Sequence, residues 1–228
     1  MNPDQIYIVV PCYNDKKVIR KTVTDLINCG YSIIVVNDGS TQNILDEVAD
    51  LHLTYALHRM NLGQGAALQT GIEIALKKGA MMIIHFDSDG QHSADDIPKM
   101  IEPLLENKAD IVIGSRFLNQ RDIEAIPFNK RLLLRVARIV NWCLTGMWLS
   151  DAHNGFRAMT RYAGEKIKIK ENRMGHASEI LIQVRHQKLR YAECPTHIVY
   201  TPYSRAKGQS AFNSINIVID LLLNKIFA

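Results

Sequence analysis

The sequence lacks the features that mark secreted and membrane-spanning proteins. It has four cysteines in 228 residues, Cys12, Cys29, Cys143 and Cys194, and none of them form a pair with metal-ligand spacing. We therefore expect small buried thiols in a reducing compartment and no disulfide framework. The start, MNPDQIYIVV, lacks the basic segment and long apolar stretch of a signal peptide. No window reaches the roughly 18 continuous apolar residues of a membrane span. These absences predict a protein made and kept in the cytoplasm.

The chain also lacks a strong charge of either sign. Its net charge is +4, which excludes a highly charged tail protein and gives no reason to expect a nucleic-acid partner. No internal repeat or low-complexity linker divides the sequence, and 47% of its residues are hydrophobic, enough for a sizeable core. We therefore predict a single domain over residues 1–228.

Short apolar runs alternate with helical patterns in the first half. The expected strands are 6–10, 32–37, 53–57, 81–87 and 109–114, and the expected helices are 15–28, 41–50, 64–78 and 94–107. Ser40 or Thr41 is expected to cap the second helix, and Ser93 the fourth. This alternation predicts an α/β fold, with a parallel sheet that helices cover on both faces.

The pattern changes after about residue 115. We expect a helix at 130–149, a glycine-aromatic segment at 154–160, a helix at 174–188, a strand at 190–200 and a helix at 209–226. We interpret residues 1–115 as a nucleotide-binding half and residues 116–228 as an acceptor-binding half of the same domain.

The most informative segment is MMIIHFDSDGQH, residues 81–92. An apolar run from Met81 to Phe86 ends in two carboxylates, Asp87 and Asp89. In open α/β sheets, ligands bind at the carboxyl ends of the strands, and two hard oxygen ligands there suit Mg²⁺ or Mn²⁺. The alternative is a strand followed by an ordinary acidic turn.

Polar residues follow the other expected strands as well. They are Pro11, Cys12, Tyr13, Asn14 and Asp15 after the first, Asn37, Asp38, Gly39 and Ser40 after the second, and Gly114, Ser115 and Arg116 after the fifth. Because parallel strands share a direction, these residues are expected to converge on one crevice with Asp87, Ser88 and Asp89. Such a group is harder to explain as unrelated turns than any one member is.

The segments VVPCYND, VVNDGST, NLGQGAALQTGIEIAL, HFDSDGQH, IVIGSRF and DAHNGFRAMT stand in the order and spacing of family 2 glycosyltransferases. Over roughly residues 5–226 the chain resembles the branch of dolichol-phosphate mannose synthases and bacterial polyprenyl-phosphate glycosyltransferases. The resemblance implies a GT-A fold, a Rossmann-like mixed, mostly parallel sheet flanked by helices, with amphipathic helices at the C-terminal end. It also implies a nucleotide-diphosphate sugar donor, inversion at the anomeric carbon and a divalent metal, Mg²⁺ or Mn²⁺.

The resemblance assigns site residues by matching motifs. The nucleotide-sugar would be bound by Pro11, Tyr13, Asp15, Asp38, Gly63, Gln64, Gly65, Asp87, Ser88 and Arg116, with Asp38 accepting from the base. The metal would be held by Asp87, Asp89 and Gln91. Three positions depart from the family pattern: Asp15 replaces a more usual Glu, Gln64 a frequent Lys, and Asn37 a first Asp. These departures weaken any inference about which nucleotide is bound.

The residues that would act on the acceptor are fewer. Asp89 would act with the metal, Asp151 would orient the acceptor or act as base, and Arg157 would support Asp151 or form a structural ion pair. Glu179 falls where the broader family carries its candidate base, and it could equally be structural. His92, His153 and His176 have no metal-ligand spacing and are interpreted as ordinary polar residues.

A phosphate acceptor needs cations more than a base, because its second pKa is about 6 and it is largely dianionic at neutral pH. Tyr203, Arg205 and Lys207 lie in an expected turn before the last helix, and they are candidate phosphate ligands. Arg131 and Arg135, with Arg138, form one stripe on the helix at 130–149. The alternatives are a solvated basic loop and an ordinary charged helix face.

Two segments, RLLLRVARIVNWCLTGMWL and SAFNSINIVIDLLLNKIF, have amphipathic patterns that suit a membrane interface. Core packing, homo-oligomerisation or a small membrane protein partner could use the same surfaces. The sequence therefore predicts a metal-dependent transferase of a UDP-sugar to a polyprenyl phosphate, attached peripherally to the cytoplasmic membrane face. The alternatives are a soluble family 2 enzyme that acts on a sugar hydroxyl, a sugar-nucleotide nucleotidyltransferase, and a catalytically silent nucleotide-binding subunit.

Overall fold

The computed structural model describes residues 5–118, 138–139, 141–143, 145–151, 154–173 and 175–197. These residues build an α/β fold on a seven-stranded sheet. The strands are β1 (Ile6–Cys12), β2 (Ser32–Asn37), β3 (Thr54–Leu57), β4 (Met82–His85), β5 (Ile111–Ser115), β6 (Arg157–Thr160) and β7 (Tyr191–Pro195). Their order across the sheet is β3-β2-β1-β4-β6-β5-β7. Neighbours pair in parallel except at β6, which is antiparallel to β4 and β5, so the predicted mixed, mostly parallel sheet is confirmed.

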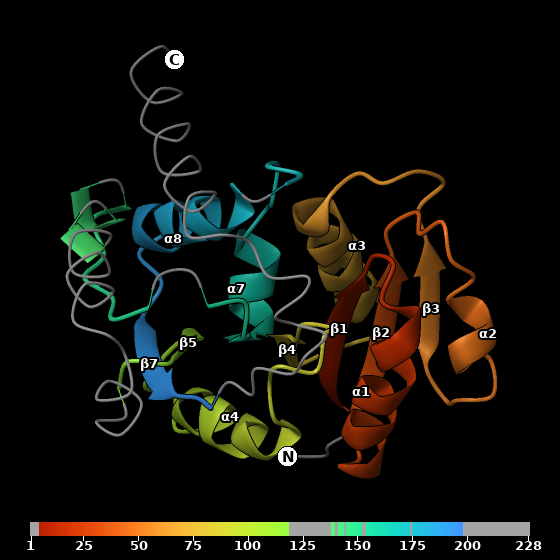
Figure 1. Ribbon diagram of the computed structural model, residues 1–228. Helices are drawn as coiled ribbons and strands as arrows, with labels where there is room; N and C mark the ends of the chain where they lie inside the picture. Colours follow the sequence, from red (N-terminus) through yellow and green to blue (C-terminus); the bar gives the residue numbers. More distant parts are fainter. Residues whose placement is uncertain are drawn as a thin grey trace.

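Helices cover both faces of the sheet (Figure 1). One face carries α1 (Lys16–Asn28), α2 (Leu45–Val48) and α4 (Ile97–Leu105), the last preceded by the 3₁₀ turn η2 (Ala94–Asp96). The other face carries α3 (Gln64–Lys77), α7 (Arg161–Lys166) and α8 (His176–His186). The strands are nearly continuous apolar runs, such as Ile83 and Ile84 in β4, because both faces are buried.

The chain order of the strands reverses between β1 and β4. The connection after β1 runs through α1 on one face, whereas β4 is reached from α3 on the other face. Such a switch point opens a crevice at the carboxyl ends of the two strands. All strands except β6 end at that edge, and β6 begins there, so the polar residues that were expected to converge do so.

Several predicted elements need correction. The second helix covers Leu45–Val48 instead of 41–50, and neither Ser40 nor Thr41 caps it. The Ser40 hydroxyl instead accepts from Asn14 N at 2.9 Å, and Thr41 N donates to Asn14 Oδ1 at 2.9 Å. These residues tie the end of β2 to the end of β1. The Ser93 cap is confirmed, because its side chain accepts from Asp95 N.

The second half differs more. Strand β6 lies in the stretch 154–160, which was predicted only as a glycine-aromatic segment. Helix α7 follows it, where no element was predicted. Within 130–149, residues 138–139, 141–143 and 145 are helical, but residues 147–149 are not. The expected helix at 209–226 lies outside the described residues. All four cysteines are free, as expected, but Cys29 and Cys143 are exposed and not buried. Among the helices described, none has the length and apolar composition needed to cross a bilayer.

Candidate active site

The ends of β1 and β4 are joined across the switch point. The Ser88 hydroxyl donates to Asp15 Oδ2 at 2.6 Å, and Asp15 is 1% exposed. Thr22 of α1 donates in turn to Ser88 O at 3.1 Å. Pro11 is buried just before this link, whereas Tyr13, directly after β1, is 40% exposed. The structure thus brings together four of the residues predicted to bind the nucleotide-sugar.

Asp38, at the end of β2, is a buried carboxylate with many donors. Its Oδ1 receives His58 Nδ1 at 2.7 Å and Leu62 N at 3.0 Å. Its Oδ2 receives Asn61 Nδ2 at 3.0 Å and Gly63 N at 2.7 Å. Asp38 therefore fixes the 58–63 loop that leads into α3. The hydrogen bond from a nucleotide base to Asp38 stays a prediction; it would add to these four contacts.

The first turn of α3 is packed against the 171–172 segment. Gly63 has φ +113°, and a Cβ there would clash with Asn172 O. A Cβ on Gly65 would clash with Glu171 O, while Gly65 N donates to Asn172 O at 2.8 Å. Only glycine fits at these two positions, because one requires a left-handed backbone and both require close contact with another main chain. This packing aims the intervening Gln64 toward β4.

Gln64 connects the 58–63 loop with the acidic pair. Its Nε2 donates to Asp87 Oδ1 at 2.9 Å, while Asp87 Oδ2 lies 3.3 Å from His92 Nε2. The ring of His92 packs between Phe86 and Phe156, with centroids at 5.6 and 5.1 Å. His92, predicted to be an ordinary polar residue, thus orients the first acid. Its position in DSDGQH, directly after the acids, was the available signal.

Asp89 is held differently. Its Oδ1 accepts from Gln91 N at 3.1 Å, which closes a tight turn after β4. Burial, together with the negative charge of Asp87, raises the pKa of Asp89 above its usual value. Burial also acts against ionisation of Asp87, but the hydrogen bond with His92 and the charge of Arg157 outweigh it and lower its pKa. The two acids repel each other, and a divalent cation would relieve that repulsion.

Three more polar side chains lie buried behind the acids. Arg157, the first residue of β6, pairs with His85 of β4 and is 1% exposed, and its Nε and Nη1 have no hydrogen-bond partner among the described residues. Burial lowers the pKa of Arg157 to about 10, while Asp87 and Asp151 both raise it. Arg157 therefore stays protonated at neutral pH between two acids. Burial lowers the pKa of His85 to about 3 and that of His176 to about 4, so both are neutral.

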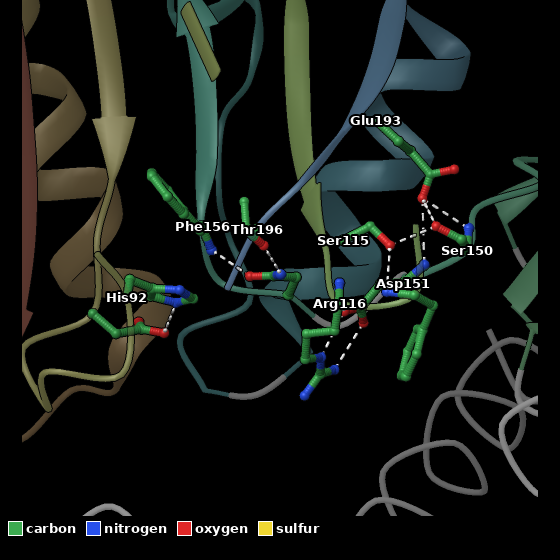
Figure 2. Close-up of polar contacts among 11 residues, drawn as sticks. His92, Ser115, Arg116, Ser150, Asp151, Phe156, Glu193 and Thr196 are labelled. Atoms are coloured by element: carbon green, nitrogen blue, oxygen red, sulfur yellow. Dashed lines mark hydrogen bonds and ion pairs between the residues drawn. The ribbon is translucent and has the colours of Figure 1, made fainter. Parts of the chain in front are cut away.

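A second ionic group follows β5. Arg116 forms a bidentate pair with Asp151, with Nε to Oδ2 at 2.6 Å and Nη2 to Oδ1 at 2.8 Å. Figure 2 shows this pair on the same edge of the sheet as His92 and Phe156. Asp151 is 3% exposed, whereas the Arg116 side chain is 31% exposed. Arg116 can therefore reach a ligand while Asp151 fixes its plane.

Glu193 of β7 holds the turn that carries Asp151 (Figure 2). Its Oε1 accepts from Ser150 N at 2.8 Å, from Ser150 Oγ at 2.6 Å and from Asp151 N at 3.3 Å. Ser115 Oγ lies 2.6 Å from Ser150 Oγ, so the end of β5 joins the same network. Sequence reasoning missed Glu193, since it lies 42 residues from Asp151 in the chain and in no motif.

Other predicted residues lie apart or outside the described part of the chain. Glu179 of α8 accepts from Lys170 N at 3.1 and 3.0 Å and from Glu171 N at 2.9 Å. It thus supports the segment that packs against α3, and its role as a base stays a prediction. The predicted acceptor-phosphate residues Arg131, Arg135, Tyr203, Arg205 and Lys207 all lie outside the described residues, as does His153.

The carboxylates of Asp87 and Asp89 are the candidate ligands for a metal ion. Among the described residues, no group of three or more His, Cys, Asp or Glu side chains is arranged around a common point. Asp87 and Asp89 provide carboxylate oxygens, which suits Mg²⁺ or Mn²⁺ bound by one or two carboxylates together with substrate phosphates and water. The donor set therefore fits such an ion and does not fit a zinc-type cage.

Sequence comparison agrees with this geometry. The family model described as glycosyl transferase family 2 matches residues 7–168. The chain is 33% identical to an uncharacterized protein of Methanocaldococcus jannaschii, over 100% of this chain and 95% of that protein. It is 31% identical to the UDP-N-acetylglucosamine–dolichyl-phosphate N-acetylglucosaminyltransferase of Methanococcus voltae, over 96% of each.

Solved structures share the fold. Glucosyl-3-phosphoglycerate synthase from Mycobacterium tuberculosis, in complex with Mn²⁺, uridine diphosphate and phosphoglyceric acid, matches with a TM-score of 0.66 and 18% identity. The match covers 96% of this chain and 77% of that one. The GT-A fold expected from the sequence is thereby confirmed.

Proposed function

The chain belongs to glycosyl transferase family 2, and from this premise we propose that it transfers a sugar from a nucleotide diphosphate to a polyprenyl phosphate. The observation that carries the proposal is the arrangement of two ionic groups on one edge of the sheet. The Asp87–Asp89 pair suits a donor diphosphate with its metal, and the Arg116–Asp151 pair presents a fixed cation beside it. The full-length similarity to the Methanococcus voltae dolichyl-phosphate enzyme supports the choice of acceptor.

On the donor side, Tyr13 is exposed directly after β1 and would contact the nucleoside. Asp38 shapes the 58–63 loop beneath it, and Gln64 orients Asp87. Asp87 and Asp89, with Gln91 beside them, would hold Mg²⁺ or Mn²⁺. Such an ion, when bound, stabilises the charge of the departing diphosphate. We propose UDP as the nucleotide.

On the acceptor side, both oxygens of Asp151 are engaged by Arg116. That arrangement suits an acceptor that needs a cation to position it, and a phosphate monoester needs no general base, because it is largely dianionic at neutral pH. Asp151 would then orient Arg116, and Arg116 would bind an anionic oxygen of a substrate. Inversion follows from in-line attack by the phosphate on the anomeric carbon.

The division into halves is part of the same proposal. Residues 1–115 would bind the donor, and residues 116–228 the acceptor. Arg131, Arg135, Tyr203, Arg205 and Lys207 would supply further contacts to the acceptor phosphate. The Arg205→Ala/Lys207→Ala double variant tests this: near-normal activity on a lipid-phosphate acceptor would exclude a phosphate-binding role for that segment.

The acceptor is a membrane lipid, so we further propose that the enzyme works peripherally on the cytoplasmic face of the membrane. The decisive experiment incubates the protein with membranes, a divalent metal and a panel of radiolabelled UDP- and GDP-sugars. We expect label in the lipid extract with one of these donors. Label only in a polysaccharide fraction would indicate a sugar-hydroxyl acceptor, and no transfer or donor hydrolysis with any of them would indicate a catalytically silent subunit.

The Asp89→Asn variant serves as the inactive reference. Asp50→Asn is its matched control, because Asp50 pairs with Arg20 of α1 on the exposed surface, away from the acidic pair. Loss of transfer in both variants alike would count against a specific role for the acidic pair.

A further inference from the structure

Two tryptophans stand exposed on the surface, one in the helical residues 141–143 and one after Gly146, shortly before Asp151. Trp142 is 50% exposed and Trp148 51% exposed, and their rings meet edge to face with centroids 6.0 Å apart. The Arg138 guanidinium lies over the Trp148 ring, 4.7 Å from its centroid, and Ile139 is 50% exposed. We call these four residues the tryptophan patch. Large aromatic side chains left half in water, next to a cation, mark an interaction surface.

Hydrogen bonds fix the turn that separates the two tryptophans in the chain. Gly146, with φ +70°, ends the helix, and its N–H donates to Trp142 O at 2.8 Å. The Thr145 hydroxyl accepts from Met147 N at 3.2 Å, which fixes the direction in which the chain leaves the turn. These two hydrogen bonds fix the course of the main chain between Trp142 and Trp148, and the edge-to-face contact of the rings orders the side chains, so less conformational entropy is lost when a partner covers them.

The segment after the turn presents one side chain outward and anchors its neighbours. Met147 is 1% exposed and Leu149 is 0% exposed, whereas Trp148 between them points to solvent. Asp151, which fixes Arg116, follows three residues later. Three residues span at most about 11 Å, so the main chain at Trp148 lies close to that at Asp151.

We infer that the tryptophan patch docks the enzyme on the surface of an anionic lipid bilayer. Tryptophan rings favour the boundary between headgroups and acyl chains, and arginine beside them pairs with anionic headgroups. The inference rests on the proposed function, since a polyprenyl phosphate presents its phosphate at that same boundary. Docking through Trp148 would bring Arg116 to the level of the acceptor phosphate.

The chain offers a direct probe of this inference. Its two tryptophans are Trp142 and Trp148, so tryptophan emission, excited selectively over that of the eight tyrosines, reports on the patch alone. Vesicles of phosphatidylcholine with phosphatidylglycerol, without any polyprenyl phosphate, are titrated into the full-length protein. We expect a blue shift of the emission, quenching by lipids brominated on the acyl chains, and weaker binding at high salt because the arginine contribution is screened.

Vesicle sedimentation then compares variants. Trp142→Ser/Trp148→Ser is expected to lower the affinity for the anionic vesicles by at least about tenfold, since two large apolar surfaces are lost. Trp142→Tyr/Trp148→Tyr should retain most of the binding and guards against misfolding as the cause. The matched control is Tyr162→Ser on α7, another half-exposed aromatic ring with a cation, Lys166, above it.

Activity separates this inference from the proposed function. The serine double variant should keep its transfer rate on a short-chain, water-soluble polyprenyl phosphate and lose it on a long-chain acceptor in vesicles. No transfer by the wild type to either acceptor would overturn the proposed function, whereas the vesicle titration would still decide the docking surface. Unchanged vesicle binding in the serine variant, or a concentration-dependent dimer that the substitutions abolish, would overturn the docking inference.

Discussion

Replacing Gly155 with alanine would place a methyl group directly against the carboxylate of Asp87. A Cβ built on Gly155 lies 2.5 Å from Asp87 Oδ2 and 3.1 Å from Asp87 Cγ, whereas ordinary contact begins at 3.4 Å. The carboxylate would therefore have to move by roughly 1 Å to restore van der Waals contact. That movement would break its hydrogen bonds with Gln64 at 2.9 Å and with His92 at 3.3 Å.

A misplacement of about 1 Å in a catalytic group can reduce the rate about 100-fold. We therefore expect Gly155→Ala to lower kcat/KM for sugar transfer by about two orders of magnitude, and to raise the Mn²⁺ concentration needed for half-maximal activity. Thermal unfolding should fall only modestly, since overpacking typically costs 1–3 kcal/mol, or about 2 kcal/mol at a single site. The assay is transfer of a radiolabelled sugar over a Mn²⁺ titration, with calorimetry of Mn²⁺ binding in the presence of the nucleotide.

Gly175→Ala is the matched control, because Gly175 has φ −61° and its added Cβ would meet only the flexible Glu171 side chain, at 3.3 Å. It should leave transfer and metal dependence near those of the wild type. If Gly155→Ala folds normally and retains metal affinity and transfer within about twofold, the reasoning that Asp87 must stay in this position is refuted.

Three further predictions concern other parts of the molecule. Glu179→Gln should keep most of the transfer activity, because an amide oxygen still accepts from main-chain N–H groups; a loss of 100-fold or more in kcat would instead support its role as a base. Ser93→Ala should lower the free energy of unfolding by about 1 kcal/mol in urea titrations, through loss of the cap. The hydrogen bond from Arg190 lowers the pKa of Asp110, so this pair stabilises the fold above the unfolded-state pKa and loses that contribution as the pH falls through the folded-state pKa. Asp110→Asn should therefore flatten the acid side of a Tm-against-pH profile; an unchanged slope would contradict that assignment.

The first half of the fold was predictable because its signals are local. Strands such as Ser32–Asn37 are short apolar runs, and each ends in polar residues that mark the edge of the sheet. The Ser93 cap likewise depends on its own neighbours in sequence. Residues whose role is set by chain direction and local hydrogen bonding can be recognised without knowledge of the rest of the molecule.

The second half was harder, because its structure depends on distant contacts. Strand β6 has four residues and begins with a buried arginine, Arg157, which argues against a strand in the middle of a sheet. Its place between β4 and β5 follows from pairing that no local pattern shows. Glu193 was missed for the same reason, since its carboxylate meets Ser150 only after β7 pairs with β5.

The predicted roles of site residues divide in the same way. The sequence singled out Asp87 and Asp89 from the abrupt end of an apolar run. The place of His92 directly after the acids was a signal for its contact with Asp87, but no local pattern showed that Gln64 holds Asp87. It paired Asp151 with Arg157 as its supporting cation, whereas the bidentate partner is Arg116. Motif membership identified which residues gather, and the hydrogen bonds decide which of them touch.

The link through Gly63 and Gln64 has a thermodynamic consequence. Asp38 accepts a hydrogen bond from Gly63 N, and the next residue, Gln64, donates one to Asp87. The 58–63 loop and the acidic pair are therefore linked through two adjacent residues. A nucleotide that shifts this loop shifts Asp87 as well, and a cation that draws in Asp87 pulls on the loop. Linkage requires each ligand to change the affinity for the other by the same factor. A nucleotide and a cation bound as proposed would therefore each change the affinity for the other through this stretch of chain.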